Sequence, residues 1–132
     1  MDPNVRTYCI YLSYCHVLLK AISAGKYTND NGGCTVFDLT TGFGQDSMIL
    51  AGDRNIQKLL MVERDEIVFL LLSDALRRLR LSADIDDRYT PLFKKLDLRK
   101  SDSIDLCTEA LSEESNLERP DICYLDPMFP PR

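Results

Sequence analysis

Short apolar runs alternate with helical segments along this chain, and this alternation restricts the fold more than any other feature. Strands are predicted at residues 35–37, 59–62, 92–98 and 122–125, and helices at residues 47–52, 66–81 and 103–111. Strands joined by helical crossovers run parallel, and the crossovers are right-handed. The pattern therefore predicts an α/β fold in which helices cover both faces of a parallel sheet, as a three-layer sandwich.

The helix at residues 66–81 has the most regular spacing. Its apolar residues recur every three or four positions, and Asp65 is suited to cap its first turn. Arg77, Arg78 and Arg80 fall in the last turn of the predicted helix, where positive charge favours the helix dipole. We interpret these arginines as a solvated helix end, with a phosphate-binding patch as the alternative.

The apolar run at residues 8–22 is the only segment that resembles a targeting signal. It is interrupted by His16 and Lys20, and it is shorter than the roughly 20 apolar residues that span a membrane. We predict an amphipathic helix that covers the sheet, with a signal peptide as the alternative. We therefore expect no membrane partner and a cytoplasmic location.

Charge and cysteine usage narrow the range of ligands. The chain of 132 residues has a net charge of -5, which disfavours broad electrostatic contact with nucleic acid, so such a partner needs a local basic patch. The five cysteines form no C-x-x-C pair, and the single histidine, His16 beside Cys15, does not complete the ligand spacing of a structural zinc site. We expect reduced, mostly packed thiols and no metal site.

Polar clusters follow all four predicted strands. They are Asp38-Leu-Thr-Thr-Gly42-Phe-Gly44-Gln-Asp46, Glu63-Arg64, Ser101-Asp102-Ser103 and Asp126-Pro127-Met128-Phe129-Pro130. Ligands bind outside the carboxyl ends of the strands in open parallel sheets. Gly42 and Gly44 are followed by an acid, Glu63, 19 residues after Gly44. Such an acid can bind the ribose of NAD or of another adenosine cofactor.

The last cluster, YLDPMFPPR, has the most specific chemistry. An acid at the end of a buried strand is followed by prolines, which stiffen the backbone, and by an aromatic ring on which a flat heterocycle can stack. With DLTTGFGQD, VER and KSDS, this motif resembles the Rossmann-like S-adenosylmethionine-dependent methyltransferases. Within them, the chain is similar to the bacterial small-subunit ribosomal RNA guanine-N2 methyltransferases called RsmJ, from about residue 18 onward.

The resemblance implies S-adenosyl-L-methionine as cofactor and ribosomal RNA or the small ribosomal subunit as partner. Residues 38–46 would wrap the methionine part of the cofactor, Glu63 would accept from the ribose hydroxyls, and Asp102 and Ser103 would lie by the adenine. The implied cofactor contacts are Asp38, Thr40, Gly42, Gly44, Gln45, Asp46, Glu63, Arg64, Asp102, Ser103 and Asp126. Glycine at positions 42 and 44 is expected to keep a Cβ from colliding with a ligand that lies on the backbone.

The implied chemistry is direct displacement, in which an exocyclic amine of a base attacks the methyl group on the sulfonium. Asp126 and the Pro127 carbonyl would orient the amine, and Phe129 would stack the base. The alternatives are methylation of DNA, another RNA or protein glutamine, and a non-catalytic remnant that binds cofactor or partner. A nucleotide-dependent oxidoreductase is a further alternative, but it explains nothing about residues 126–130.

The resemblance also concerns the extent of the chain. A basic residue is usual where Gln45 stands, and the family continues well beyond its D-P-M-F-P motif. We therefore expect residues 1–132 to be one incomplete domain, truncated after the fourth strand, with an N-terminal helix and connector at 1–32 and a cofactor-binding half at 33–132. The fourth strand is expected to have an unpaired edge.

Overall fold

The fold is that of a computed structural model, which describes residues 8–11, 15–24, 27 and 32–126. The elements are β1 (Tyr8–Tyr11), α1 (Cys15–Ser23), β2 (Cys34–Asp38), α2 (Gln45–Ala51), β3 (Ile56–Glu63), α3 (Glu66–Ile85), η1 (Asp87–Tyr89), α4 (Thr90–Phe93), β4 (Leu96–Lys100), α5 (Ser103–Leu111) and β5 (Ile122–Leu125). Within these residues the strands form one five-stranded sheet in the order β1-β5-β2-β3-β4, and all neighbours pair in parallel.

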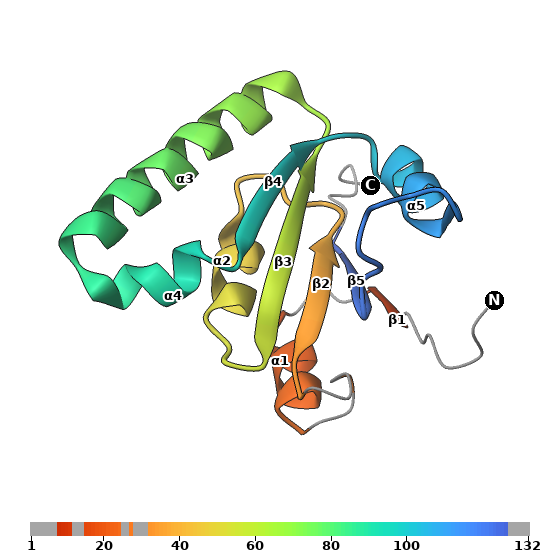
Figure 1. The fold of residues 1–132 in the computed structure, drawn as a ribbon, viewed down its shortest axis with the longest axis horizontal. Coiled ribbons are helices and arrows are strands. Elements are labelled where there is room, and N and C mark those ends of the chain that lie inside the picture. The colour runs from red at the N-terminus through yellow and green to blue at the C-terminus, as the bar shows by residue number, and fades with distance from the viewer. Residues whose placement is uncertain (1–7, 12–14, 25–26, 28–31, 127–132) are drawn as a thin grey trace, which may run out of the picture.

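Helices cover both faces of this sheet, as the alternation of strands and helices predicted. Side chains from α1, α2 and α3 pack on one face in a core that includes Leu18, Leu50 and Leu72. On the other face, Leu106 and Ala110 of α5 pack against β2, β3 and β5. Successive strand residues alternate between the two cores, which gives a three-layer α/β/α sandwich (Figure 1).

The strand arrows of β2, β3 and β4 point in the same direction in Figure 1, so their carboxyl ends lie at the same end of the sheet. The chain leaves β2 toward β3 on one side, and it later returns to β5 on the other side of β2. The carboxyl ends of β2 and β5 therefore lie at the switch point of the topology, where open α/β sheets hold their ligands.

The amino-terminal segment differs from the helix expected at residues 8–22. Tyr8–Tyr11 is a strand that pairs with Ile122–Leu125, and the helix begins only at Cys15. A run of four apolar residues carries no period that separates strand from helix, so pairing with β5 decides its conformation. The same pairing corrects the expected unpaired edge, because β5 lies between β1 and β2.

Two further expectations are corrected. The third strand does not begin at residue 92, because Thr90–Phe93 forms a helical turn with proline at its start, and the strand covers Leu96–Lys100. The helix α3 continues to Ile85, so the arginines at positions 77, 78 and 80 lie before its last turn. Arg77 and Arg78 pair with Asp74 on the same helix.

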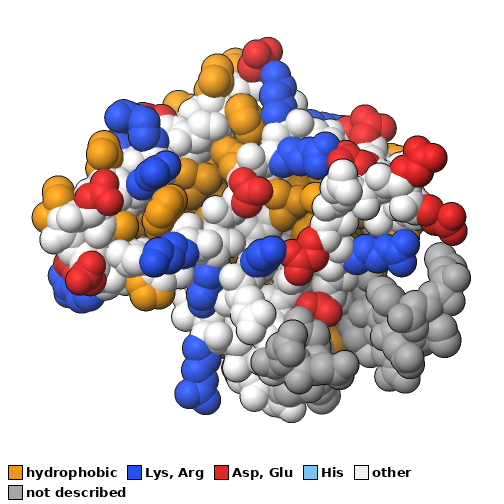
Figure 2. Space-filling view, viewed as in Figure 1, with side chains coloured by type: hydrophobic (Ala, Val, Ile, Leu, Met, Phe, Trp, Pro, Cys, Tyr) orange, Lys and Arg blue, Asp and Glu red, His pale blue; other side chains and the backbone are white. Residues whose placement is uncertain are grey.

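Charged side chains of both signs are interspersed over the face of the molecule in Figure 2. The described ion pairs have the same mixed character, such as Lys100 with Glu66 and Arg99 with Glu109. On the part of this face that belongs to described residues, positive and negative side chains therefore alternate.

Candidate active site

The loop between β2 and α2 is a tight turn held by its own backbone. Gly42 and Gly44 have φ angles of 54° and 79°, in the left-handed region that favours glycine. The Gly44 N–H donates to the Thr41 carbonyl at 2.9 Å. The reason for glycine differs between the two positions. A Cβ on Gly44 would lie 2.8 Å from the end of Met61 and 2.9 Å from Leu72, whereas one on Gly42 would meet nothing within 4 Å.

Asp38, at the end of β2, is a buried carboxylate beneath this loop. Its oxygens accept from the Ser47 hydroxyl at 2.5 Å and from the Thr40 N–H at 3.1 Å. The pKa of Asp38 is raised from 3.8 to about 6, chiefly because burial penalises the charged form. Those two hydrogen bonds oppose the rise, and the charges of Asp46 and Asp126 add to it. The site thus collects three carboxylates around the start of α2.

Glu63 connects the loop to the end of β3. One carboxylate oxygen accepts from the Gly42 N–H at 3.0 Å and the other from the Asp65 N–H at 2.7 Å. Thr41 ties the same two strands together, because its hydroxyl accepts from the Val62 N–H at 2.9 Å. Each oxygen of a carboxylate can accept more than one hydrogen bond, so both oxygens of Glu63 keep accepting capacity in a fixed orientation.

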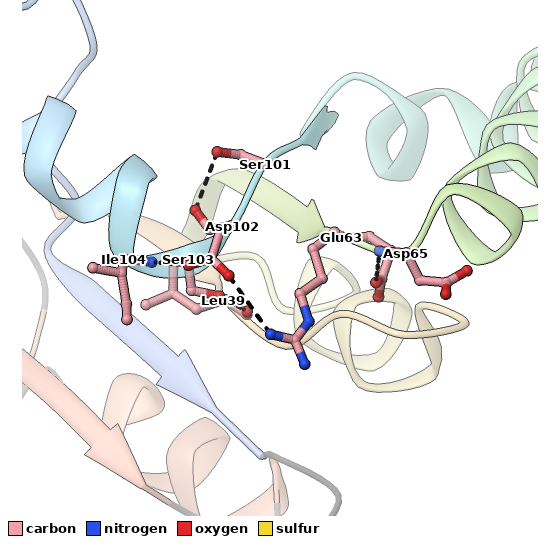
Figure 3. A network of polar contacts seen from close by, with 8 residues as sticks. Leu39, Glu63, Asp65, Ser101, Asp102, Ser103 and Ile104 are labelled. Carbon is pink, nitrogen blue, oxygen red and sulfur yellow. Dashed lines mark hydrogen bonds and ion pairs between the residues drawn. The ribbon is translucent and has the colours of Figure 1, made fainter.

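The loop after β4 approaches the same place (Figure 3). Asp102 caps α5 by accepting from the Ile104 N–H at 2.8 Å, and its other oxygen lies 3.6 Å from the Arg64 guanidinium. Ser103 donates to the Leu39 carbonyl in the loop after β2. These contacts bring together the loops that follow β2, β3 and β4.

The end of β5 is joined to the loop after β2 and to the start of α2 by three hydrogen bonds. The Asp126 N–H donates to the Thr40 hydroxyl oxygen at 2.8 Å, and the Leu39 N–H donates to the Tyr124 carbonyl at 3.0 Å. The buried Tyr124 hydroxyl donates to Asp46 at 2.6 Å. Asp126 is therefore held by its backbone, while its carboxylate takes no part in these three contacts.

One cavity of about 460 Å³ lies where these loops meet. It is lined by Leu39, Thr40, Val62, Glu63, Arg64, Asp102, Ser103, Ile104 and Asp126. Residues after all four predicted strands thus reach one cavity, as their positions at the strand ends led us to expect. Five predicted cofactor contacts do not line this cavity: Asp38 at the end of β2, Gly42 and Gly44 in the adjacent loop, and Gln45 and Asp46 in the first turn of α2. Pro127 and Phe129 lie outside the described residues.

Several residues of the site were not singled out from the sequence. Leu39, Val62 and Ile104 supply the apolar wall of the cavity, and each is directly next in sequence to a predicted polar residue. Tyr124 orients Asp46, which lies 78 positions away in the sequence. Ser47 orients Asp38, which lies nine positions away. Of these two residues, Tyr124 had a signal in the sequence that could have identified it, because it lies two residues before Asp126.

Two other kinds of site are not found among the described residues. No group of three or more histidine, cysteine, aspartate or glutamate residues in this part of the chain could hold a metal ion. Among the same residues, no helix combines the length and apolar character needed to cross a membrane.

The sequence matches the family described as "Putative SAM-dependent methyltransferase" over residues 16–132. The chain belongs to this family. The expected resemblance to S-adenosylmethionine-dependent methyltransferases is therefore confirmed, and the family implies S-adenosyl-L-methionine (SAM) as the cofactor.

Similar curated proteins have a more specific name. The chain is 34% identical over 115 residues to ribosomal RNA small subunit methyltransferase J of Saccharophagus degradans, which covers 84% of this chain and 41% of the relative. It is 42% identical over 98 residues to the protein of that name from Shewanella pealeana, covering 74% of this chain and 36% of the relative. The chain thus spans about 40% of the length of the curated relatives that it matches.

A solved structure has the same fold. The crystal structure of a SAM-dependent methyltransferase from Neisseria gonorrhoeae aligns with a TM-score of 0.65 at 25% sequence identity, over 90% of this chain and 46% of that protein. This similarity confirms the Rossmann-like methyltransferase fold that the family resemblance implied.

The residues around the cavity fit the chemistry of SAM. A volume of about 460 Å³ is in the usual range for small-molecule sites, roughly 300–1,000 Å³. Apolar side chains from Leu39, Val62 and Ile104 can cover a flat base, and the anchored Glu63 offers acceptors for hydroxyl groups. The carboxylates of the site suit a ligand that carries a positive sulfonium.

Proposed function

We propose that this chain is the cofactor-binding part of a methyltransferase that acts on the 2-amino group of a guanine in small-subunit ribosomal RNA. The observation that carries the proposal is the meeting of Thr40, Glu63, Asp102 and Asp126 at one cavity. Family membership supports SAM as the methyl donor, and the names of the curated relatives support ribosomal RNA as the substrate.

Glu63 is proposed to bind the ribose of the cofactor. Both of its oxygens are held by backbone N–H groups, so the carboxylate is oriented before any ligand arrives. Orienting an acceptor in advance lowers the entropy that binding must remove. The ribose hydroxyls would donate to the lone pairs that face the cavity, and Arg64 would lie beside them.

The adenine is proposed to lie against Asp102, Ser103 and Ile104, at the start of α5. Ser103 is engaged with the Leu39 carbonyl, so its contribution is to hold the wall in place. The loop from Asp38 to Asp46 would then face the methionine part. Gln45 is exposed there, and Asp46 is oriented by Tyr124.

SAM, when bound, supplies an electrophilic methyl group on a positively charged sulfur. Asp126 is proposed to accept a hydrogen bond from the guanine amine and to orient its lone pair toward that methyl group. The same carboxylate would stabilise the positive charge that develops on the nitrogen. Thr40 fixes the backbone of Asp126, and we propose from the family resemblance that Pro127 and Phe129 complete the substrate site. A base that is paired in RNA must first leave its stack.

The proposal is tested first by calorimetric titration of the chain with SAM, with S-adenosylhomocysteine and with NAD. We expect SAM to bind and NAD not to bind. Glu63→Gln should weaken SAM binding at least about tenfold, which corresponds to the loss of roughly 1.4 kcal/mol. Glu66→Gln is the matched control, because Glu66 pairs with Lys100 on the surface, and it should leave affinity unchanged. Binding of NAD without SAM would contradict the proposal.

Methyl transfer is tested separately with radiolabelled SAM and small ribosomal subunits that lack the modification. We expect the label on the guanine 2-amino group, and we expect Asp126→Asn to reduce transfer while SAM affinity changes little. Label on another nucleotide or on protein would refute the guanine assignment. SAM binding with no transfer to any of these substrates would indicate a binding function in its place.

A further inference from the structure

The helix α3 exposes a row of large apolar side chains along one side. Ile67, Leu71, Leu81 and Ile85 are 70%, 54%, 51% and 89% exposed. Asp74 and Arg78 lie between them, with side chains that are 45% and 67% exposed. We call these six residues the α3 stripe. Figure 2 shows apolar side chains, interleaved with charged ones, along the border of the molecule that α3 occupies in Figure 1.

The spacing of the α3 stripe is that of a helix-pairing seam. Its residues follow one another at intervals of four, three, four, three and four positions. This is the repeat of the contact positions in coiled coils, where each side chain inserts between side chains of a facing helix. The α3 stripe is not the row that faces the protein core, because Leu72, Leu76 and Ala83 take that place.

The order of residue types reads the same in both directions, apart from the sign of the central charges. Two apolar residues, an acid, a base and two apolar residues are arranged symmetrically about position 76. If a second α3 lies antiparallel against the first, Ile67 faces Ile85 of the second copy, and Leu71 faces Leu81. Asp74 then faces Arg78 of the second copy, and by symmetry this contact occurs twice.

We propose that α3 is a self-association surface that binds a second copy of this chain in an antiparallel, two-fold symmetric pair. A two-fold interface requires one surface that is complementary to itself, and the α3 stripe meets that requirement in the order of its apolar residues and in its central charges. A parallel pair would keep the apolar contacts, but it would place Asp74 against Asp74 and Arg78 against Arg78. The central charges therefore select the antiparallel orientation.

Asp74 and Arg78, the two charged residues at the centre of the α3 stripe, already lie close to each other within one chain. Within one chain, Asp74 lies 2.9 Å from Arg77 and 3.3 Å from Arg78. Pairing would place the Arg78 guanidinium of the second copy beside the same carboxylate and exclude water from it. An ion pair that loses contact with water is screened less by salt, so the centre specifies the partner more strongly than a solvated pair does.

The length of the seam limits the strength of the association. A helix of 20 residues such as α3 is about 30 Å long, which is fewer than three heptads. The surface that two helices of this length bury against each other lies at the low end for specific complexes. We therefore expect a reversible dimer with a dissociation constant in the micromolar range. The antiparallel orientation also places Ile85 of the second copy near the first turn of α3, which follows the cavity residues Glu63 and Arg64.

Sedimentation equilibrium of the chain at about 5 to 500 µM tests the proposal. We expect a monomer–dimer equilibrium that Leu71→Glu and Leu81→Glu each weaken at least about tenfold. Leu111→Glu is the matched control, because Leu111 is at least as exposed as Leu71 and Leu81, at 64%, but lies on α5. It should leave the equilibrium unchanged. Circular dichroism of each variant verifies that α3 is still helical.

Charge exchange identifies the contact itself. Asp74→Arg and Arg78→Asp should each weaken self-association at least about tenfold, because like charges then meet across the two-fold axis. A mixture of the two variants should associate, because every central contact again joins opposite charges. A chain that stays monomeric at all concentrations, a dimer that is insensitive to Leu71→Glu, or a mixture that does not associate would each overturn the proposal. These outcomes do not depend on SAM binding.

Discussion

Asp38 is a buried carboxyl whose ionisation is coupled to folding in the acidic pH range. Its pKa is about 6 in the folded protein and 3.8 without the fold, so the folded state binds the proton more tightly. The stabilisation that this proton gives is fully present below about pH 4, falls as the pH rises toward 6 and is absent above it. Asp38→Asn should remove this loss, which amounts to at most roughly 3 kcal/mol, because asparagine carries no charge. Its amide oxygen can accept from the Thr40 N–H, and its NH2 group can donate to the Ser47 hydroxyl in a reversed hydrogen bond.

Urea unfolding at pH 4.5, 5.5 and 7 measures this dependence. The advantage of Asp38→Asn over the wild-type protein should grow across these three values. Glu113→Gln changes an exposed loop carboxyl and should follow the wild-type protein. A constant difference between Asp38→Asn and the wild-type protein would show that the carboxyl does not titrate in this window.

Gly42 and Gly44 share a left-handed backbone but differ in their surroundings. Alanine at either position should cost about 1 kcal/mol, because a side chain is strained at these φ angles. Alanine at position 44 should cost roughly 1–3 kcal/mol more, because its Cβ would push on Met61 and Leu72 in the core. The difference between Gly44→Ala and Gly42→Ala in urea unfolding measures the packing part alone. Equal losses would mean that the two side chains move aside without cost.

At the scale of elements, Asp65 separates helix stability from ligand binding. Its side chain caps α3 by accepting from Ile67 and Val68, while its backbone N–H donates to Glu63. Asp65→Ala should therefore lower the free energy of unfolding by about 1 kcal/mol, and Asp65→Asn should retain most of it. Both variants keep the backbone donor, so SAM affinity in calorimetry should not change. A loss of affinity with Asp65→Ala alone would show that the cap also positions Glu63.

Local signals in the sequence predicted the elements whose conformation is set locally. The cap at Asp65 and the helical spacing after it located α3, and α5 begins and ends where it was expected. The segment Tyr8–Tyr11 was predicted incorrectly because its strand forms through pairing with residues more than 110 positions away. The start of β4 was predicted incorrectly because Pro91 is compatible with a helical turn as well as with an extended chain.

The candidate site was predictable to the level of strand ends. Parallel topology alone brings the residues after β2, β3, β4 and β5 to one edge, and Thr40, Glu63, Asp102 and Asp126 do line one cavity there. The hydrogen bonds that orient them could not be predicted, because they join side chains to partners far away in the sequence. Asp126 with Thr40, 86 positions apart, is the clearest case.

At the scale of the whole molecule, the sheet joins four loops into one site. Thr41 and Glu63 connect the ends of β2 and β3, Ser103 connects α5 to the loop after β2, and Asp126 connects β5 to that same loop. A ligand in the cavity therefore contacts parts of the chain that are held to one another. Opening of any one loop must loosen the contacts of the others.

Hydrogen exchange with and without SAM tests this coupling. At a SAM concentration of about 100 times Kd, an opening that releases the ligand becomes about 100-fold rarer. Amide protection should therefore rise together at residues 39–44, 63–65, 101–103 and 126. Residues 53–55 and 112–121, which connect elements at the opposite end of the sheet, should exchange at unchanged rates. Protection confined to one of the four loops would mean that the loops open independently, and the cavity would then not be a single binding site.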